Sequence, residues 1–423
     1  MKKLILIFIA LLLASSILPG CKPVVGFEHW HLFGNDEMPN ASKEVVAEPL
    51  CENLSAQKSK GIKNVVIFGD SLSDTNTLKG RRLQMNPEKP FFLGRFSNGP
   101  VWNDYLADCV KLGVENYSQG GAMTKSSVMV PSDELLSYIR ELGRSLAIGS
   151  VDQFVDDYLK EHNGIIENPD KTLFIIWAGA NDYLSKFDNS DDLTTMIDLP
   201  DTPYKGGNAI AKISAENIGD DIHKLYDAGA RTIVVANMPD IGVTPSIKSN
   251  KSYLPDGLSN DARHYRLSEE LSRITTLHNK LLAQKIYEIS SNLDDSTLKI
   301  AIFDSAEALK NLMNNKGPHG ENNFDYGIDL EKSFTKLSVP GKKPIRIGQK
   351  CYTGGYFGSD DQKKICPDVA KMFFWDEIHP TTAGHCGIAF LLHNFLNDEN
   401  IIEQKAQFEE YKKLCTHSPN QSP

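Results

Sequence analysis

The chain has 423 residues, of which 40% are hydrophobic and 24% are charged, and its formal net charge is −10. A chain of this length can bury a full hydrophobic core, in one large domain or two medium ones. Acidic and basic residues are mixed along it with an acidic excess, which argues against a nucleic-acid partner because such a partner requires a basic face.

The N-terminus predicts export. Two lysines precede the apolar run Leu4 to Leu13, which is too short to span a bilayer and is typical of a secretory signal peptide. The stretch Leu18-Pro19-Gly20-Cys21 resembles a bacterial lipobox, in which the cysteine carries a lipid, although a proline is unusual there. We therefore expect residues 1–21 to direct export from a bacterial cytoplasm. The mature protein would be either an outer-membrane lipoprotein anchored at Cys21 or a secreted, extracellular protein.

Beyond the signal peptide, the pattern predicts an extension, one domain and a tail. Residues 22–60 lack a regular hydrophobic period and are interpreted as an N-terminal extension. From residue 61 to 398, short β-branched runs alternate with helical patterns, which is typical of an α/β fold with a mainly parallel central sheet, a three-layer α/β/α sandwich. Residues 399–423 are interpreted as a C-terminal tail. Strands are expected at 65–68, 173–177, 232–236 and 299–303, and helices at 101–112, 132–144, 151–162, 210–228, 261–290, 306–313 and 381–396.

The first candidate site segment follows the first strand. Parallel sheets bind ligands beyond the carboxyl ends of their strands, and Gly69-Asp70-Ser71-Leu72 occupies that place. A serine on a tight turn can present its hydroxyl as a nucleophile, while backbone N–H groups of the turn face a developing oxyanion. The familiar Gly-x-Ser-x-Gly pattern is not satisfied, because Ser73 occupies its last position. The alternative is a polar helix cap without chemistry.

Two further segments could supply contacts to an oxyanion. The segment 116–122, with Val114 ahead of it at a candidate strand end, contains Gly120-Gly121, where the backbone can approach a ligand closely. The segment 179–182 follows the strand at 173–177 and offers the side-chain amide of Asn181. Each segment could equally be an ordinary turn, in which Asn, Asp and Gly are common.

A fourth segment pairs a carboxylate with an imidazole. Asp376 and His379 lie three residues apart before the last predicted helix. This spacing can place the carboxylate on one imidazole nitrogen and leave the other nitrogen to take a proton from a serine. The alternative is a surface histidine that only precedes a proline at a helix start.

In this order, these segments resemble the SGNH/GDSL family of lipases and esterases. Residues 68–75 are similar to the family's first block, and 116–122, 179–182 and 376–381 to later blocks, with 236–242 similar to an intermediate loop. The resemblance covers residues 62–396 and implies an SGNH hydrolase-like fold. It implies that Ser71 is the nucleophile, that His379 is the general base and then acid, and that Asp376 orients the imidazole. The backbone N–H groups of Ser71 and Gly121 and the side chain of Asn181 would form the oxyanion hole.

Within the family, the chain is most similar to the long secreted bacterial branch of phospholipases and glycerophospholipid:cholesterol acyltransferases. That likeness implies a phospholipid or lysophospholipid substrate at a membrane surface, with cholesterol as a candidate acyl acceptor. It also implies activation by a protease that nicks a loop near a disulfide. The cationic segment 331–350, interpreted as an exposed loop, is the candidate for that role. An inert surface insertion is the alternative.

The cysteines favour an oxidising compartment. Apart from Cys21 there are six, an even set that an exported chain can oxidise. Cys351 and Cys366 lie close together around a glycine-rich loop, and we expect them to form a disulfide, so that 331–366 combines the cationic loop with a disulfide loop. The remaining connectivity cannot be read from spacing, and buried thiols are the alternative.

The sequence therefore predicts an exported serine lipolytic enzyme that works through an acyl-serine intermediate. It hydrolyses phospholipid or lysophospholipid esters or transfers the acyl group to a sterol or another lipid alcohol. No metal or organic cofactor is expected, because no Cys/His cluster has zinc spacing. Two alternatives stay open: a short-chain or carbohydrate esterase of the same fold, and a catalytically inactive surface-binding lipoprotein.

Overall fold

The structure is a computed structural model that describes residues 51, 61–77, 79, 87–126, 147–187, 190–199, 202, 205–356 and 364–416. The predicted signal peptide with Cys21, the extension apart from Cys51, and the predicted helix at 132–144 lie outside these residues. Among the described residues, no helix is both long and apolar enough to cross a membrane.

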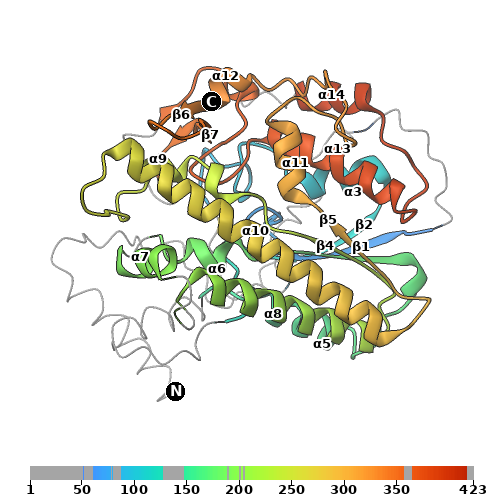
Figure 1. Cartoon of the computed structure of the whole chain (residues 1–423). Helices are drawn as coiled ribbons and strands as arrows, with labels where there is room; N and C mark the ends of the chain where they lie inside the picture. Colours follow the sequence, from blue (N-terminus) through green and yellow to red (C-terminus); the bar gives the residue numbers. More distant parts are fainter. Residues whose placement is uncertain are drawn as a thin grey trace, which may run out of the picture.

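A parallel sheet of five strands forms the centre of the molecule (Figure 1). Its spatial order is β2-β1-β3-β4-β5, and every neighbouring pair is parallel. The register aligns Gly69, Ser118, Trp177, Ala236 and Phe303 at the carboxyl ends. The segments that follow these residues therefore meet at one edge of the sheet. The strands are β1 (Asn64–Gly69), β2 (Gly113–Ser118), β3 (Thr172–Trp177), β4 (Thr232–Ala236) and β5 (Lys299–Phe303).

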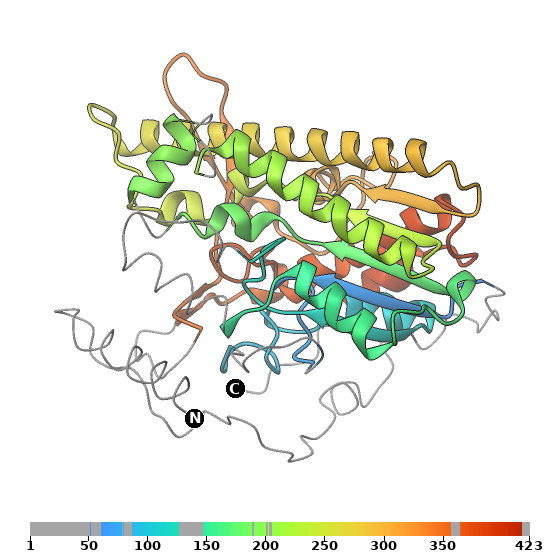
Figure 2. The same cartoon turned by 90° about the horizontal axis from the view of Figure 1, so that it is seen from below.

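Helices cover both faces of the sheet, which confirms the predicted α/β/α sandwich. Alternate residues of a strand point to opposite faces, and in β1 Val65 and Ile67 belong to one buried core whereas Val66 and Phe68 belong to the other. The first core is covered by α3 (Trp102–Val110), α11 (Ser305–Leu312), α13 (Thr382–Asp398) and α14 (Phe408–Thr416). The second is covered by α5 (Val151–Glu161), α8 (Gly207–Asp227) and α10 (Asn260–Leu293), and Figure 2 shows α8 and α10 side by side.

Short elements gather at the left of Figure 1, among them α6 (Ala180–Leu184), α7 (Ser190–Asp198), α9 (Ser246–Ser249), β6 (Phe334–Leu337) and β7 (Ile345–Gly348). The other short elements of this part of the chain are η4 (Ile241–Val243), α12 (Leu330–Ser333), β8 (Tyr352–Thr353), β9 (Lys364–Ile365) and η5 (Val369–Lys371). One further short element, η3 (Pro169–Lys171), precedes β3.

The cationic segment 331–350 differs from the exposed loop expected from its sequence. It contains the antiparallel hairpin β6–β7. Phe334, Leu337 and Ile347 are buried, so the hairpin packs against the body and only its tip, residues 340–344, is exposed throughout. The sequence predicts a loop because the segment is rich in lysine and has only a few apolar residues.

Three disulfides tie outlying segments to the domain. Cys51 is bonded to Cys109 of α3, and Cys351 to Cys366. Residues 357–363, inside the loop that the second disulfide closes, lie outside the described residues. Cys386 of α13 is bonded to Cys415 of α14, a helix that lies within the segment interpreted from the sequence as a tail.

Candidate active site

Ser71 lies on a tight turn directly after β1. The Asp70 carboxylate accepts a hydrogen bond from the Leu72 backbone N–H at 3.0 Å, and the Asp70 carbonyl accepts one from the Ser73 N–H at 3.1 Å. Only glycine fits before the turn, because a Cβ on Gly69 would lie 2.9 Å from the Trp177 carbonyl oxygen. The turn thus holds Ser71 at the carboxyl edge of the sheet, where 7% of its surface is accessible.

Asp376 and His379 lie on a second tight turn, just before α13. The carboxylate accepts hydrogen bonds from the backbone N–H groups of Ile378 at 3.0 Å and His379 at 2.9 Å. The Trp375 N–H donates to the His379 carbonyl at 2.8 Å and closes the turn. The backbone itself therefore fixes the carboxylate beside the imidazole.

The two turns meet and form a hydrogen-bonded line of three side chains. His379 Nε2 lies 2.8 Å from Ser71 Oγ, and His379 Nδ1 lies 2.9 and 2.8 Å from the two Asp376 carboxylate oxygens. The carboxylate can only accept, so Nδ1 carries the proton and Nε2 accepts from the serine hydroxyl. The structure thus brings together the three residues expected from the sequence, in an arrangement that can activate a serine for attack on an ester.

The glycine pair lies on a loop tied to the serine turn. The Gln119 N–H donates to the Gly69 carbonyl at 3.2 Å, and the Gly120 N–H donates to the Asp74 carboxylate at 2.8 Å. A Cβ on Gly120 would lie 2.2 Å from a ring carbon of Phe96, and Gly121 has φ +82°. Both positions therefore require glycine, one for close approach and the other for a left-handed backbone.

Asn181 reaches this loop from the start of α6. Its Nδ2 donates to the Ala122 carbonyl at 3.0 Å. The neighbouring Asp182 carboxylate accepts from the Thr124 N–H at 3.1 Å and the Thr124 hydroxyl at 2.8 Å. The loop after β2 and the turn after β3 are thereby locked together. Asn181 lines the same pocket as Ser71 and His379.

A loop that the sequence analysis did not single out clamps the histidine turn. The Ser97 hydroxyl donates to the Pro380 carbonyl at 3.0 Å, and the Thr382 N–H donates to Asn98 Oδ1 at 2.8 Å. The Phe96 ring lies against the imidazole of His379, with 5.1 Å between centroids. The sequence of this loop, residues 89–100, has aromatic residues without a regular period and the turn signal Ser-Asn-Gly, which gives no indication of a contact with residues about 280 positions away.

The disulfide loop also contacts the histidine turn. Tyr352 stacks on Trp375 with ring centroids 5.1 Å apart, and its N–H donates to the Trp375 carbonyl at 2.6 Å. The Tyr356 ring lies edge-on to His379, with 6.0 Å between centroids. The Cys351–Cys366 disulfide therefore belongs to a cluster that packs directly behind Asp376 and His379.

Burial shifts the pKa values of two ionisable groups around the site. It raises the pKa of Asp70 to about 6, an effect that the hydrogen bond from Leu72 and the charge of His379 partly offset. Burial also lowers the pKa of His385 to about 3, with a smaller contribution from repulsion by His379. His385 is therefore neutral near pH 7. The imidazole that contacts the serine is that of His379.

A pocket opens beside Ser71 and His379, and its volume of about 730 Å³ includes space open to solvent. Its polar lining residues include Ser71, Asn181 and His379, whereas most of the lining is apolar. Its apolar lining residues are Leu72, Trp177, Ala180, Leu184, Pro239, Ile241, Phe303, Ala308, Leu309, Phe373, Phe374, Ile378, Pro380 and Ile388. Within the described residues, no cluster of His, Cys, Asp and Glu could hold a metal ion.

Comparison with known proteins places this geometry in context. The family model described as GDSL-like Lipase/Acylhydrolase matches residues 65–389. The Phosphatidylcholine-sterol acyltransferase of Aeromonas hydrophila is 25% identical over 360 residues, which cover 82% of this chain and 93% of that protein. The Thermolabile hemolysin of Vibrio parahaemolyticus is 24% identical, covering 85% of this chain and 68% of its own. The Secreted effector protein SseJ of Salmonella typhimurium is 26% identical, covering 81% and 67%.

Proposed function

This chain belongs to the GDSL-like lipase/acylhydrolase family, and we propose that it is an exported serine hydrolase that cleaves acyl esters of phospholipids and lysophospholipids. The observation that carries the proposal is the hydrogen-bonded line from Ser71 through His379 to Asp376 at the mouth of an apolar pocket. Such a pocket suits the acyl part of a lipid, and the line of side chains suits attack on its ester carbonyl.

The first half of the reaction forms an acyl-serine. Ser71 Oγ attacks the ester carbonyl carbon while its proton passes to His379 Nε2, 2.8 Å away. Asp376, on the opposite side of the ring, stabilises the imidazolium that results. The tetrahedral intermediate then collapses, the bond to the alcohol oxygen breaks, and that oxygen leaves with the proton from Nε2.

The oxyanion of the intermediate is assigned to three donors. These are the backbone N–H groups of Ser71 and Gly121 and the Nδ2 of Asn181, which carries a second N–H beside the one donated to Ala122. Support comes from the hydrogen bonds that lock the Gly121 loop to the serine turn and to α6. Because these donors are held in advance, they need little reorganisation as charge develops on the carbonyl oxygen.

The second half of the reaction releases the acyl group. Water gives a proton to His379 Nε2 and attacks the acyl carbon, and Ser71 departs with that proton. A lipid hydroxyl can replace water, in which case the acyl group is transferred. The similarity to the Aeromonas hydrophila phosphatidylcholine-sterol acyltransferase supports phospholipid as the acyl donor and a sterol such as cholesterol as an acceptor.

Export and activation by a protease complete the proposal. Three disulfides and the secreted character of one relative support a location outside the cytoplasm, either on the outer membrane or in the medium. The exposed tip of the β6–β7 hairpin, residues 340–344, is the segment that a protease would cut. The test is limited proteolysis followed by an acyl-transfer assay with cholesterol. Cleavage within 331–350 without a change in rate would reject the activation step.

The function is tested by comparing two substrates. Purified protein is incubated with phospholipid vesicles and, separately, with acetylated oligosaccharides, and the released fatty acid and acetate are measured. We expect release of fatty acid and little release of acetate. Acetate release with intact phospholipid would favour the alternative of a carbohydrate or short-chain esterase, and no turnover of either would favour an inactive surface-binding lipoprotein.

A further inference from the structure

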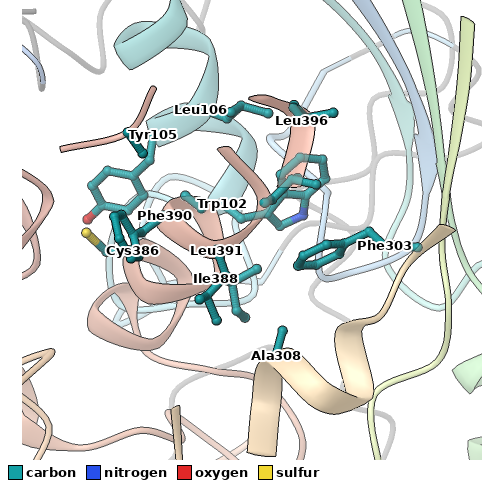
Figure 3. Close-up of a cluster of buried hydrophobic side chains, with 14 of the residues drawn as sticks. Trp102, Tyr105, Leu106, Phe303, Ala308, Cys386, Ile388, Phe390, Leu391 and Leu396 are labelled. Atoms are coloured by element: carbon teal, nitrogen blue, oxygen red, sulfur yellow. The ribbon is translucent and has the colours of Figure 1, made fainter. Parts of the chain in front are cut away.

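The pocket beside Ser71 extends into the hydrophobic core of the domain. Its lining combines Ser71, His379 and Asn181 with Phe303, Ala308 and Ile388, which belong to the core beneath α11 and α13. Figure 3 shows these three apolar side chains, from β5, α11 and α13, directed toward one space. The pocket thus connects the hydroxyl of Ser71 with apolar side chains of the core.

This path is closed where α11 crosses α13. Ala308, Leu309 and Ile388 keep 6%, 7% and 8% of their surface accessible, whereas Leu312, one turn further along α11, keeps 0%. A Cβ on Gly387 would lie only 2.6 Å from a methyl carbon of Leu312, so the two helices touch there. The pocket therefore ends at Ala308, Leu309 and Ile388.

The polar groups along the wall are already paired inside the protein. The Ser305 hydroxyl donates to the Asn237 carbonyl. The Asp240 carboxylate accepts from the Gly242 N–H at 2.8 Å and from the Ser272 hydroxyl at 2.8 Å. A sugar would have to compete with these bonds, whereas an alkyl chain needs no polar partner.

A closed pocket also decides which half of the ester enters it. The acyl group becomes bonded to Ser71 in the first half of the reaction and stays there until the second half, whereas the alcohol must leave and water must then arrive. An alcohol held at the closed end would be trapped behind the acyl-serine. The closed end suits the acyl chain, and the alcohol lies on the side of the solvent.

We infer that this pocket binds the acyl chain of the substrate and that Ala308 and Ile388 set the chain length it accepts. The inference rests on the proposed acyl-serine chemistry and names the part of the substrate that the protein measures. Burial of one methylene contributes about 0.8 kcal/mol, which corresponds to about a 4-fold gain in kcat/KM. The gain should continue with each methylene until the chain reaches the crossing of α11 and α13.

The test is a series of p-nitrophenyl esters from acetyl to octanoyl, each below its aggregation limit. Ala308→Phe replaces a methyl group of the lining with a ring and takes up space in the pocket, so the octanoyl ester should lose at least about 10-fold in kcat/KM while the acetyl ester stays within about 2-fold. Ile388→Ala should move the optimum to longer esters. Ala306→Phe is the matched control, because Ala306 lies on α11 but does not line the pocket.

Either variant can overturn the inference. An unchanged chain-length profile in Ala308→Phe, or the same loss in Ala306→Phe, would contradict it. If Ala308→Phe does not fold, an unchanged optimum in Ile388→Ala contradicts it independently. The probes carry no phospholipid head group, so a protein that responds as expected yet leaves phospholipid intact would reject the phospholipid assignment and keep the acyl pocket.

Discussion

Replacement of Asp376 by Asn tests the geometry of the site most closely. One carboxylate oxygen accepts from the backbone N–H groups of Ile378 and His379, and also lies 2.9 Å from His379 Nδ1. The other oxygen lies 2.8 Å from Nδ1 alone. In Asp376→Asn the amide oxygen is expected to keep the two backbone bonds, which places the NH2 group against Nδ1. The imidazole must then carry its proton on Nε2, and this nitrogen can no longer accept the proton of Ser71.

The expected loss in kcat is on the order of 10⁴-fold, or about 5 kcal/mol of transition-state stabilisation. KM should change little, because Asp376 does not line the pocket. The assay measures kcat and KM with a p-nitrophenyl ester, together with the thermal unfolding midpoint, which should stay within a few degrees because the backbone bonds persist. A kcat within about tenfold of the wild type, in a folded protein, would refute the role given to Asp376.

Three further predictions address the nucleophile, the glycine loop and acid stability. Ser71→Ala should abolish turnover and labelling by a fluorophosphonate, whereas Ser73→Ala, which only removes a 3.2 Å bond from Trp102 Nε1, should keep both and lose about 1 kcal/mol of stability; labelling of Ser71→Ala would contradict the assignment. Gly120→Ala places a Cβ 2.2 Å from Phe96, so it should destabilise the fold by about 1–3 kcal/mol and lower kcat. Adding Phe96→Leu should recover part of the lost stability, because it removes the ring that the new methyl group meets. Thermal melts of the single and double variants measure this coupling, and purely additive losses would contradict the contact. Burial lowers the pKa of three histidines, to about 4, 3 and 4, from about 6.5 in the unfolded chain: His278, His385 and His393. Their neutral forms favour the fold above pH of about 6.5, and the free energy of unfolding should fall as the pH drops toward 4. The fall is smaller than three histidines alone would give, because burial raises the pKa of Asp70 to about 6 and of Asp221 to about 7, and protonation of these two carboxyls favours the fold in the same range. Urea denaturation at pH values across this window measures the slope, and a flat profile would count against the burial of these rings.

The sandwich could be predicted because its central strands are continuous apolar runs. β3, β4 and β5 match the expected ranges to within one residue. β3 and β4 are almost completely buried, and β5, although an edge strand of mostly intermediate burial, is apolar from Ile300 to Phe303. β2 was expected only through Val114, because it is an edge strand whose first three residues are not buried and carry no apolar pattern. The hairpin β6–β7 was missed for a related reason, since its strands have only four residues each and lie in a segment rich in lysine.

The three residues of the hydrogen-bonded line could be found because they follow strands or precede a helix, and parallel topology brings such places together. The clamp at Ser97 and Asn98 and the aromatic contacts of Tyr352 could not, because they join segments about 280 and 20 residues apart through single hydrogen bonds and ring faces. The pocket depends on how far α11 stands from α13, which is decided by side chains such as Ala308 and Leu312 and by Gly387. The hydrophobic period of a helix predicts which of its faces is buried, but it does not predict the space left between two buried helices.

The most direct test of the account is an analysis of lipid products. Wild-type protein and Ser71→Ala are incubated with mixed phospholipid vesicles, with and without cholesterol, and all lipids are measured by mass spectrometry. The account predicts free fatty acid and lysophospholipid with the wild type alone, and cholesteryl ester in addition when the sterol is present. Unchanged phospholipid with a wild-type protein that still turns over p-nitrophenyl esters, or equal products with Ser71→Ala, would contradict it.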